Sequence, residues 1–313
     1  MRSLLSLVLA ASLTTAPVLD PGGPRGTGFQ DGRTSGVILR DSKIVLSGNG
    51  LGAKGDGYRV KRPCWYEPGD KADDMLNRQQ NIREDWFHTH PTGTAEDFDQ
   101  FLKQYKDKVG QNGRWWAPAY NAADPDGLAC ATGLPGAVWV PQGATPPGGI
   151  TLQELYDLAR AALTVPEPKI ELSPNVKSYV NLPTWVWLTG IGATTRSVTA
   201  EIPGVMSATV TATLARVKID PGTTADRAEV KDACGPTGHP YVKGGTFTCG
   251  VRYLRASADQ ARKTYTLTVT TEWPVTAGGA GGFAFQPVQA TAVRDVPVGE
   301  VQTTVRKSTT GDS

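Results

Sequence analysis

Residues 264–275 read TYTLTVTTEWPV, and this stretch decides the fold class. Apolar and polar residues alternate along it, and Val, Thr and aromatic residues predominate, which is typical of a strand with one buried face. Three further segments have the same character: 205–219 (VMSATVTATLARVKI), 247–254 and 290–305. Turn residues such as Asp220-Pro221-Gly222 separate them. Several short strands at this spacing predict an all-β sandwich over residues 179–306, which is the size of one immunoglobulin-like unit.

Helices are predicted upstream of the strands, over residues 95–109, from residue 151 onward and, more weakly, over 71–84. Thr94 stands three residues before Asp97 and resembles an N-terminal capping box, after which apolar residues recur at helical spacing. Thr151 and Glu154 form a complete capping box at the start of the other helix, and prolines end it.

The chain of 313 residues therefore divides into two predicted domains, and its overall class is α+β. Residues 37–163 are predicted to form a small α+β domain that opens with a short strand pair or hairpin at 37–46. A proline-punctuated linker at 164–178 precedes the sandwich. A Pro/Gly-rich flexible leader is predicted at 17–36 and a disordered tail at 307–313.

The N-terminus predicts export from the cell. Arg2 supplies a positive charge, and Leu4 to Leu13 (LLSLVLAASL) form an apolar run with the length of a signal-peptide core, too short to cross a bilayer as a helix. Thr14-Thr15-Ala16 provides small residues for cleavage, and Ala10-Ala11-Ser12 is the alternative. We therefore predict a signal peptide at residues 1–16, an extracellular or secreted protein, and no later segment that spans a membrane.

The four cysteines, Cys64, Cys130, Cys234 and Cys249, agree with export. An even number of cysteines in an exported chain predicts disulfide bonds. Three pairings are possible, and the spacing favours Cys64–Cys130 and Cys234–Cys249, one in each predicted domain. Zinc ligation would require cysteines paired at short spacing, which this sequence lacks.

The segment His88-Thr89-His90-Pro91 is a weak candidate for a metal site. In a strand, His88 and His90 would point to the same side, as zinc ligands must. The segment is similar to the HxHP motif of JAMM-type metallopeptidases, but no serine stands at the spacing of the downstream Ser-x-x-Asp of those enzymes. The alternative, which we favour, is a polar turn before the helix at 95, with no metal bound.

Nucleotide binding and covalent catalysis find no support in the motifs. Residues 48–53 (GNGLGA) match G-x-G-x-x-A, but the following residues (KGDGYRVKRPC) cannot form the helix that would hold a pyrophosphate. The P-loop and the G-x-S-x-G motif are both missing from the sequence, and the cysteines are predicted to be oxidised. We therefore predict no cofactor and no enzymatic activity.

Two of the tryptophan pairs stand out among the eight tryptophans. Trp115 and Trp116 are adjacent, which places one ring on each face of a strand, so we predict that they border a binding surface. Trp185 and Trp187 are two residues apart and face the same side of a strand. They are predicted to fill the core or an interdomain contact, and a carbohydrate platform is the alternative.

Several segments together resemble a family of secreted actinobacterial proteins of unassigned function, over roughly residues 62–305. The resemblance rests on CWYEP at 64–68, AEDF at 95–98, WWAP at 115–118, NLPTWVWL at 181–188, CGPTGHPY at 234–241, Cys249, Glu272-Trp273 and VGEVQ at 298–302. It implies an exported protein with a C-terminal immunoglobulin/PKD-like sandwich. Labels used in that family include "ATP/GTP-binding protein" and "enoyl reductase", and the resemblance supplies no catalytic residues.

The charge balance of the chain disfavours one class of partner, nucleic acid. With 32 Lys and Arg against 30 Asp and Glu, the sequence offers no electrostatic case for nucleic acid. We expect an exported, non-enzymatic structural or binding protein of the cell envelope or extracellular space, whose partner is another secreted or envelope protein or a cell-wall glycan. The alternatives are a metal-dependent hydrolase that uses His88 and His90, and a carbohydrate-binding module.

Overall fold

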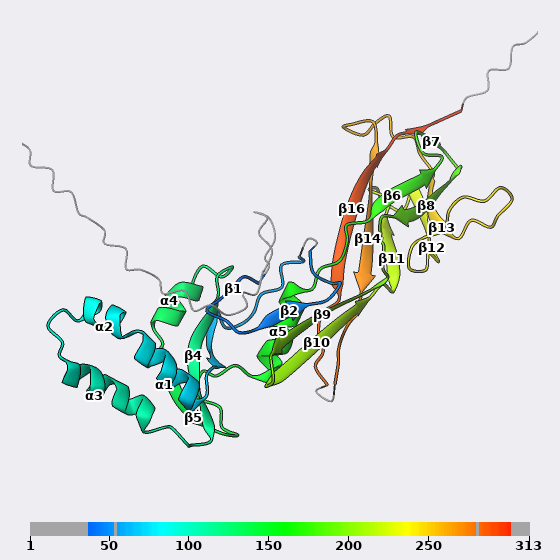
Figure 1. Ribbon diagram of the computed structural model, residues 1–313. Helices are drawn as coiled ribbons and strands as arrows, with labels where there is room; N and C mark the ends of the chain where they lie inside the picture. The colour runs from blue at the N-terminus through cyan, green and yellow to red at the C-terminus, as the bar shows by residue number, and fades with distance from the viewer. Residues whose placement is uncertain (1–36, 53–54, 280–281, 302–313) are drawn as a thin grey trace, which may run out of the picture.

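The computed structural model describes residues 37–52, 55–279 and 282–301. The predicted signal peptide (1–16), leader (17–36) and tail (307–313) lie outside the described residues. The chain forms a mixed α/β structure in which strands predominate and two disulfides are present, in agreement with the α+β class. The molecule is elongated, with most of its helices at one end and an all-β region at the other (Figure 1).

A four-stranded sheet organises the helical end. Its central strand, β4, pairs with β3 along one edge and with β1 and β5 along the other. The strands are β1 (Leu39–Arg40), β3 (Cys64–Pro68), β4 (Gly113–Asn121) and β5 (Val138–Pro141). The helices are α1 (Ala72–Asn81), α2 (Arg83–Thr89) and α3 (Ala95–Lys106) between β3 and β4, and α4 (Gly127–Thr132) after β4. The disulfide between Cys64 and Cys130 joins β3 to α4, which confirms the predicted pairing.

Both predicted capping boxes are present. The Thr94 hydroxyl accepts the backbone N–H of Asp97, and the Asp97 carboxylate accepts the backbone N–H of Thr94, so α3 begins where the sequence predicted. Thr151 and Glu154 exchange the same bonds at the start of α5 (Leu152–Ala162). The weaker helix predicted at 71–84 is divided in the structure, where α1 ends before Ile82 and α2 begins after it.

A second sheet carries α5 on one face and combines strands from both ends of the sequence. Its order is β15-β10-β9-β2, and all its pairings are antiparallel. The strands are β2 (Val45–Ser47), β9 (Thr195–Ile202), β10 (Met206–Thr213) and β15 (Val275–Ala277). Helix α5 packs across β9 and β10.

The strand pair predicted at 37–46 is therefore not a hairpin. β1 pairs with β4, whereas β2 pairs with β9 in the other sheet. The reason lies between them, where the Ser42 hydroxyl and the Lys43 backbone N–H both donate to the buried carboxylate of Glu67 on β3. These bonds hold the chain on β3 and direct the following residues into the second sheet.

The all-β end contains two larger sheets and a short parallel pair. One sheet has the order β12-β13-β8-β6 and the other β11-β14-β16. The strands are β6 (Lys169–Ser173), β8 (Pro183–Thr189), β11 (Arg216–Asp220), β12 (Ala228–Asp232), β13 (Cys249–Tyr253), β14 (Tyr265–Trp273) and β16 (Val288–Val296), with β7 (Ser178–Tyr179) beside β17 (Val298–Gly299). The second predicted disulfide, Cys234–Cys249, lies at the start of β13.

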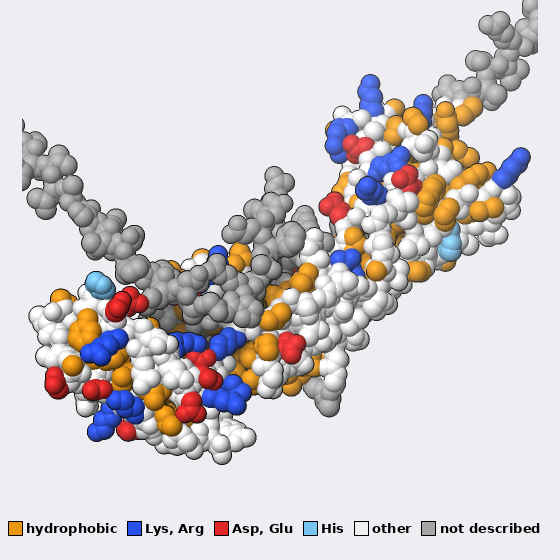
Figure 2. All heavy atoms as spheres, in the orientation of Figure 1, with side chains coloured by type: hydrophobic (Ala, Val, Ile, Leu, Met, Phe, Trp, Pro, Cys, Tyr) orange, Lys and Arg blue, Asp and Glu red, His pale blue; other side chains and the backbone are white. Residues whose placement is uncertain are grey.

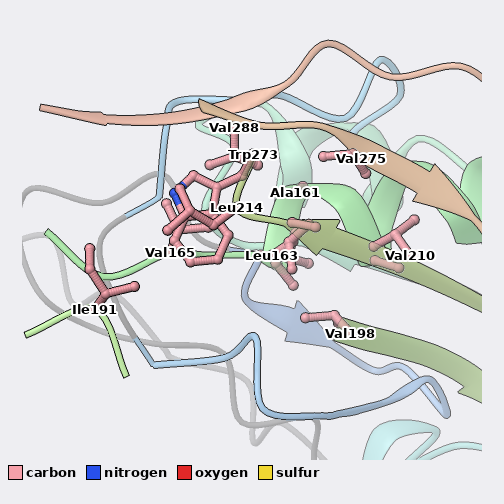
Figure 3. Close-up of a cluster of buried hydrophobic side chains, with 14 of the residues drawn as sticks. Ala161, Leu163, Val165, Ile191, Val198, Val210, Leu214, Trp273, Val275 and Val288 are labelled. Carbon is pink, nitrogen blue, oxygen red and sulfur yellow. The ribbon is translucent and has the colours of Figure 1, made fainter. Parts of the chain in front are cut away.

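Two long strand segments connect the all-β end to the sheet under α5. β10 continues into β11, and β14 continues through Pro274 into β15. Backbone hydrogen bonds from Thr213 to Pro274 and from Ala215 to Glu272 keep the two segments paired across the bend. Trp273 is fully buried at this bend, and Figure 3 shows it in a cluster with side chains from α5, from the sheet under α5 and from β16, including Ala161, Val210 and Val288.

The segment predicted as a linker, 164–178, is not a free connection. Residues 169–173 within it form β6, an edge strand that pairs with β8 along its whole length. Arg294 on β16 donates to the backbone carbonyls of Ile170 and Asn175, which ties the segment to the opposite sheet. Alternation of Ile170 and Leu172, both buried, gives β6 its inward face. The division into two domains stays a prediction.

Replacing Trp273 with Ala is expected to lower the free energy of unfolding by roughly 3–5 kcal/mol, because a fully buried indole is removed where two sheets and α5 meet. Urea denaturation of the oxidised protein measures the change. Val293→Ala on β16 is the control, since that side chain is 61% exposed and should change stability little. Equal effects of the two substitutions would show that the bend is not a shared core.

Candidate functional site

The prediction that Trp115 and Trp116 border a binding surface is wrong. The two rings do lie on opposite faces of β4, but both faces are covered, and the residues are only 4% and 6% exposed. Trp115 packs with Tyr105 of α3 and with Trp139, whereas Trp116 joins the main core. The helices between β3 and β4 cover the face of β4 on which Trp115 lies, and the sequence pattern did not predict this.

Neither the favoured polar turn nor the strand required for a metal site is correct for His88, because His88 lies in α2 and His90 is the C-terminal cap of that helix. Residues two apart on a helix point in different directions, so the rings do not converge. The His90 ring instead stacks on Trp86, with 4.3 Å between ring centroids. Among the described residues, no group of His, Cys, Asp and Glu side chains is arranged to hold a metal ion.

The glycine-rich loop at 48–52 serves backbone packing. The Gly50 N–H donates to the Ser197 carbonyl of β9, and Thr164 donates to the Gly50 carbonyl. A side chain at Gly48 would meet the Ser197 carbonyl oxygen at 2.2 Å, and Gly48 has a positive φ of 124°. Glycine is therefore required here to lay the loop on β9, an explanation that involves no phosphate.

The buried face of α5 carries a polar network beside a cavity of about 60 Å³. The Tyr58 hydroxyl donates to Asp157, and Arg160, which is fully buried, forms an ion pair with Asp56 and lies over the Tyr58 ring. Burial and the bond to Asp157 raise the pKa of Tyr58 to about 12. These contacts hold residues 56–58 against α5, so we assign the polar network a structural role.

Glu67 is a second buried ionisable group, and it also belongs to the fold. It accepts the Trp65 indole N–H at 2.7 Å, the Ser42 hydroxyl at 2.8 Å and the Lys43 backbone N–H at 2.6 Å. Burial raises the pKa of this carboxyl, and the three donors oppose that rise. With its oxygens occupied by protein donors, Glu67 is positioned to hold the chain between β1 and β2 on β3.

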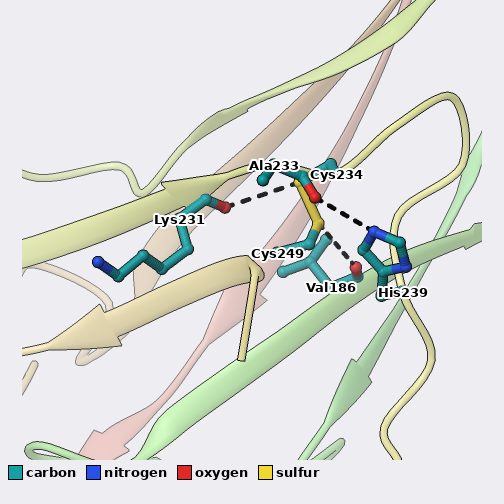
Figure 4. Close-up of a disulfide and its surroundings, with 6 residues drawn as sticks. All are labelled: Val186, Lys231, Ala233, Cys234, His239 and Cys249. Carbon is teal, nitrogen blue, oxygen red and sulfur yellow. Dashed lines mark hydrogen bonds between the residues drawn. A yellow bond between two sulfur atoms is a disulfide. The ribbon is translucent and has the colours of Figure 1, made fainter. Parts of the chain in front are cut away.

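The loop between β12 and β13 is the candidate binding element. The Cys234–Cys249 disulfide closes it over a sequence separation of 15 residues. In Figure 4 the bond lies between the end of β12 and β8, and the Cys249 sulfur is 3.2 Å from the Val186 carbonyl oxygen. The His239 ring Nε2 lies 3.1 Å from the Ala233 carbonyl oxygen, which requires that this nitrogen carry the proton.

The first half of the loop continues the sheet beside β8. β13 pairs with β8 only as far as Trp185, and beyond that point the loop takes its place, with a bridge between Gly238 and Trp187. The Thr237 carbonyl accepts the Leu188 N–H at 2.8 Å. A Cβ at Gly238 would lie 2.7 Å from the Trp187 Cα, and its φ is +77°, so glycine is required for this approach.

The second half of the loop folds over Trp185 and exposes its tip. The rings of Tyr241 and Phe247 pack against Trp185 with centroid distances of 5.7 and 5.6 Å. Trp185 is buried beneath the loop and not in the sandwich core that the sequence predicted, while Trp187 is half-buried. Tyr241 and Val242, however, are 52% and 60% exposed. The loop therefore presents apolar groups to solvent from an ordered, disulfide-closed base.

Sequence reasoning noted the tryptophans and cysteines but missed this element. The available signal was the segment CGPTGHPYVKGGTFTC at 234–249, in which turn residues and a disulfide enclose aromatic and aliphatic residues. The sequence alone does not show which residues of this segment cover Trp185. It therefore does not distinguish the exposed tip of the loop from its buried base.

Comparison with known proteins adds no relative. No protein-family model matches the chain, and comparison with curated proteins and with solved structures finds no match. Of the helices in the described part of the chain, none combines the length and apolar character needed to cross a bilayer.

Removing the loop disulfide by Cys234→Ser with Cys249→Ser is expected to cost about 3 kcal/mol of stability, since the bond limits the unfolded chain. The double variant should also be cut by trypsin faster after Lys243, an exposed residue at the loop tip. Cleavage after Lys263, in the turn before β14, is the internal control. An unchanged rate at Lys243 would mean that the disulfide does not order the tip.

Glu67→Gln is expected to lower the free energy of unfolding by roughly 1–3 kcal/mol, because the amide offers one acceptor atom where three donors converge. Urea denaturation near neutral pH measures the effect. Glu84→Gln, on the exposed surface of α2, is the matched control and should be nearly neutral. A neutral Glu67→Gln would contradict the anchoring role.

Proposed function

We propose that this protein is an exported binding protein, and that the disulfide-closed loop at 234–249 is its binding element. The exposed Tyr241 and Val242 on this loop carry the proposal. Aromatic groups held on a rigid base lose little conformational entropy on association, which favours contact with a partner. The tip offers contact area rather than a nucleophile or a proton-transfer group, which favours binding over catalysis.

An immunoglobulin-type sandwich is the support that we propose for the loop. Along the chain, β6, β8, β11, β12, β13, β14 and β16 correspond to strands A to G. The sheet orders β12-β13-β8-β6 and β11-β14-β16 are then D-E-B-A and C-F-G, the constant-type arrangement. In this arrangement the candidate loop is the D–E connection, at an end of the sandwich where loops of this fold bind partners.

A tyrosine corner gives independent support for this topology. Tyr265 stands at the start of β14, the proposed strand F, and its hydroxyl lies 3.2 and 3.1 Å from the backbone carbonyls of Arg255 and Ala256. A tyrosine at this position that bonds to the backbone just upstream is a hallmark of such sandwiches. Arg227 donates to the same hydroxyl and completes the corner. The PKD-like character implied by the resemblance is compatible with this arrangement.

Export is the second part of the proposal. It is supported by the predicted signal peptide at 1–16 and by the two disulfides, because such bonds persist in oxidising spaces outside the cytoplasm. The family resemblance points the same way. We infer that the protein works in the extracellular space or on the cell envelope, and that its partner is another secreted or envelope protein or a cell-wall glycan.

Replacing Tyr241 and Val242 together with Ser is expected to reduce retention of the oxidised protein on the envelope fraction of the producing cells at least several-fold, with little change in stability, because both side chains are exposed. A pull-down with quantified bound fraction measures this. Val293→Ser, on the exposed face of β16, is the matched control. Retention equal to that of the unmodified protein would remove the loop from the proposal.

A further inference from the structure

The outer face of the sheet beneath the loop carries polar and aromatic side chains in a fixed pattern. In the antiparallel register of β6 and β8, Glu171 is opposite Trp187, Ser173 is opposite Trp185, and Lys169 is opposite Thr189. Ile170 and Leu172 of β6 point into the core, so the alternate residues face outward. A carboxylate, an amine and two hydroxyls therefore flank the two tryptophans.

Trp187 is the half-buried tryptophan of this face, and it has no aromatic contact from the loop among the described residues. The rings of Tyr241 and Phe247 pack against the Trp185 ring. The loop residue paired with Trp187 is Gly238, which has no side chain to cover the indole. Tyr241, which packs against Trp185, is a second aromatic side chain here and is exposed. Figure 2 shows hydrophobic side chains gathered at this end of the molecule, with a histidine and a basic side chain at the rim.

From these observations, and resting on the proposed binding function, we propose that Trp187 and Tyr241 bind the pyranose rings of a neutral polysaccharide of the cell envelope. The apolar face of a pyranose ring stacks on an indole or phenol, and its hydroxyls need donors and acceptors beside that ring. Glu171 and Lys169 supply one charge of each sign next to Trp187, and Thr189 and Ser173 supply hydroxyls.

The charge pattern favours a neutral ligand over a polyanion or an acidic peptide. On the other side of β8, Arg252 pairs with Glu229 at 3.5 Å, so the sheet presents both signs close together. A lipid surface fits less well, because charged residues stand at the level of the rings and would lose water without a partner. Glu171 and Lys169 form no ion pair within residues 37–52, 55–279 and 282–301, and a hydroxyl-rich ligand would satisfy both.

The test uses the full oxidised protein and three insoluble neutral polysaccharides, cellulose, chitin and β-1,3-glucan. We expect retention on at least one of them, and roughly tenfold weaker retention after Trp187→Leu, which keeps an apolar side chain but removes the flat ring. Trp187→Phe should keep most of the binding. Tyr179→Ala, a partly exposed aromatic on β7, is the control. Failure to bind any of the three, or equal retention of the Leu and Phe variants, would overturn the inference.

A second arm separates this inference from the proposed function. The envelope fraction is treated either with glycoside hydrolases that cut the polysaccharides of the first test, or with a proteinase, before the protein is added. Loss of retention after the glycoside hydrolases alone is expected. Loss after proteinase alone would leave the loop as a binding element and refute the glycan as its ligand. Retention that neither treatment nor the loop substitutions change would refute both.

Discussion

Helix α5 buries every side chain from Leu155 to Ala162, and the rest of the structure depends on this packing. One face of the helix lies on β9 and β10, and the other is covered by the segments that carry Tyr58 and Phe283. A helix buried all round must satisfy any charge it carries. Asp157 and Arg160 meet this need through Tyr58 and Asp56, which fixes an otherwise irregular N-terminal stretch.

The same packing explains how the all-β end is held. Helix α5 lies on β9 and β10; β10 runs on into β11, and β14 runs back through Pro274 into β15. Because the paired segments stay hydrogen-bonded through the bend at Trp273, the two ends cannot hinge there without breaking both the ladder and the core. The loop at 234–249 is thus placed at a defined distance and direction from the helical end (Figure 1).

Local signals predicted local structure well. Alternation identified β10–β11 and β14, the capping boxes placed the starts of α3 and α5, and spacing paired the four cysteines. The predictions that were wrong concern features that depend on tertiary contacts. Trp115 and Trp116 alternate correctly, but periodicity does not reveal that helices cover the second face of β4. His88 and His90 were expected in a polar turn, or in a strand if they bound a metal, because the helical signal predicted at 71–84 did not extend over the second helix.

The Trp185 ring packs against the rings of Tyr241 and Phe247. Val242 lies in a turn closed by the Gly245 N–H and the Val242 carbonyl, and this turn does not require an aliphatic side chain. A polar residue at 242 would serve such a turn equally well and would avoid exposing apolar surface. Likewise, a smaller residue at 187 would keep the β6–β8 ladder intact. The backbone hydrogen bonds at these two positions do not by themselves require apolar side chains, which is compatible with the binding role proposed for both.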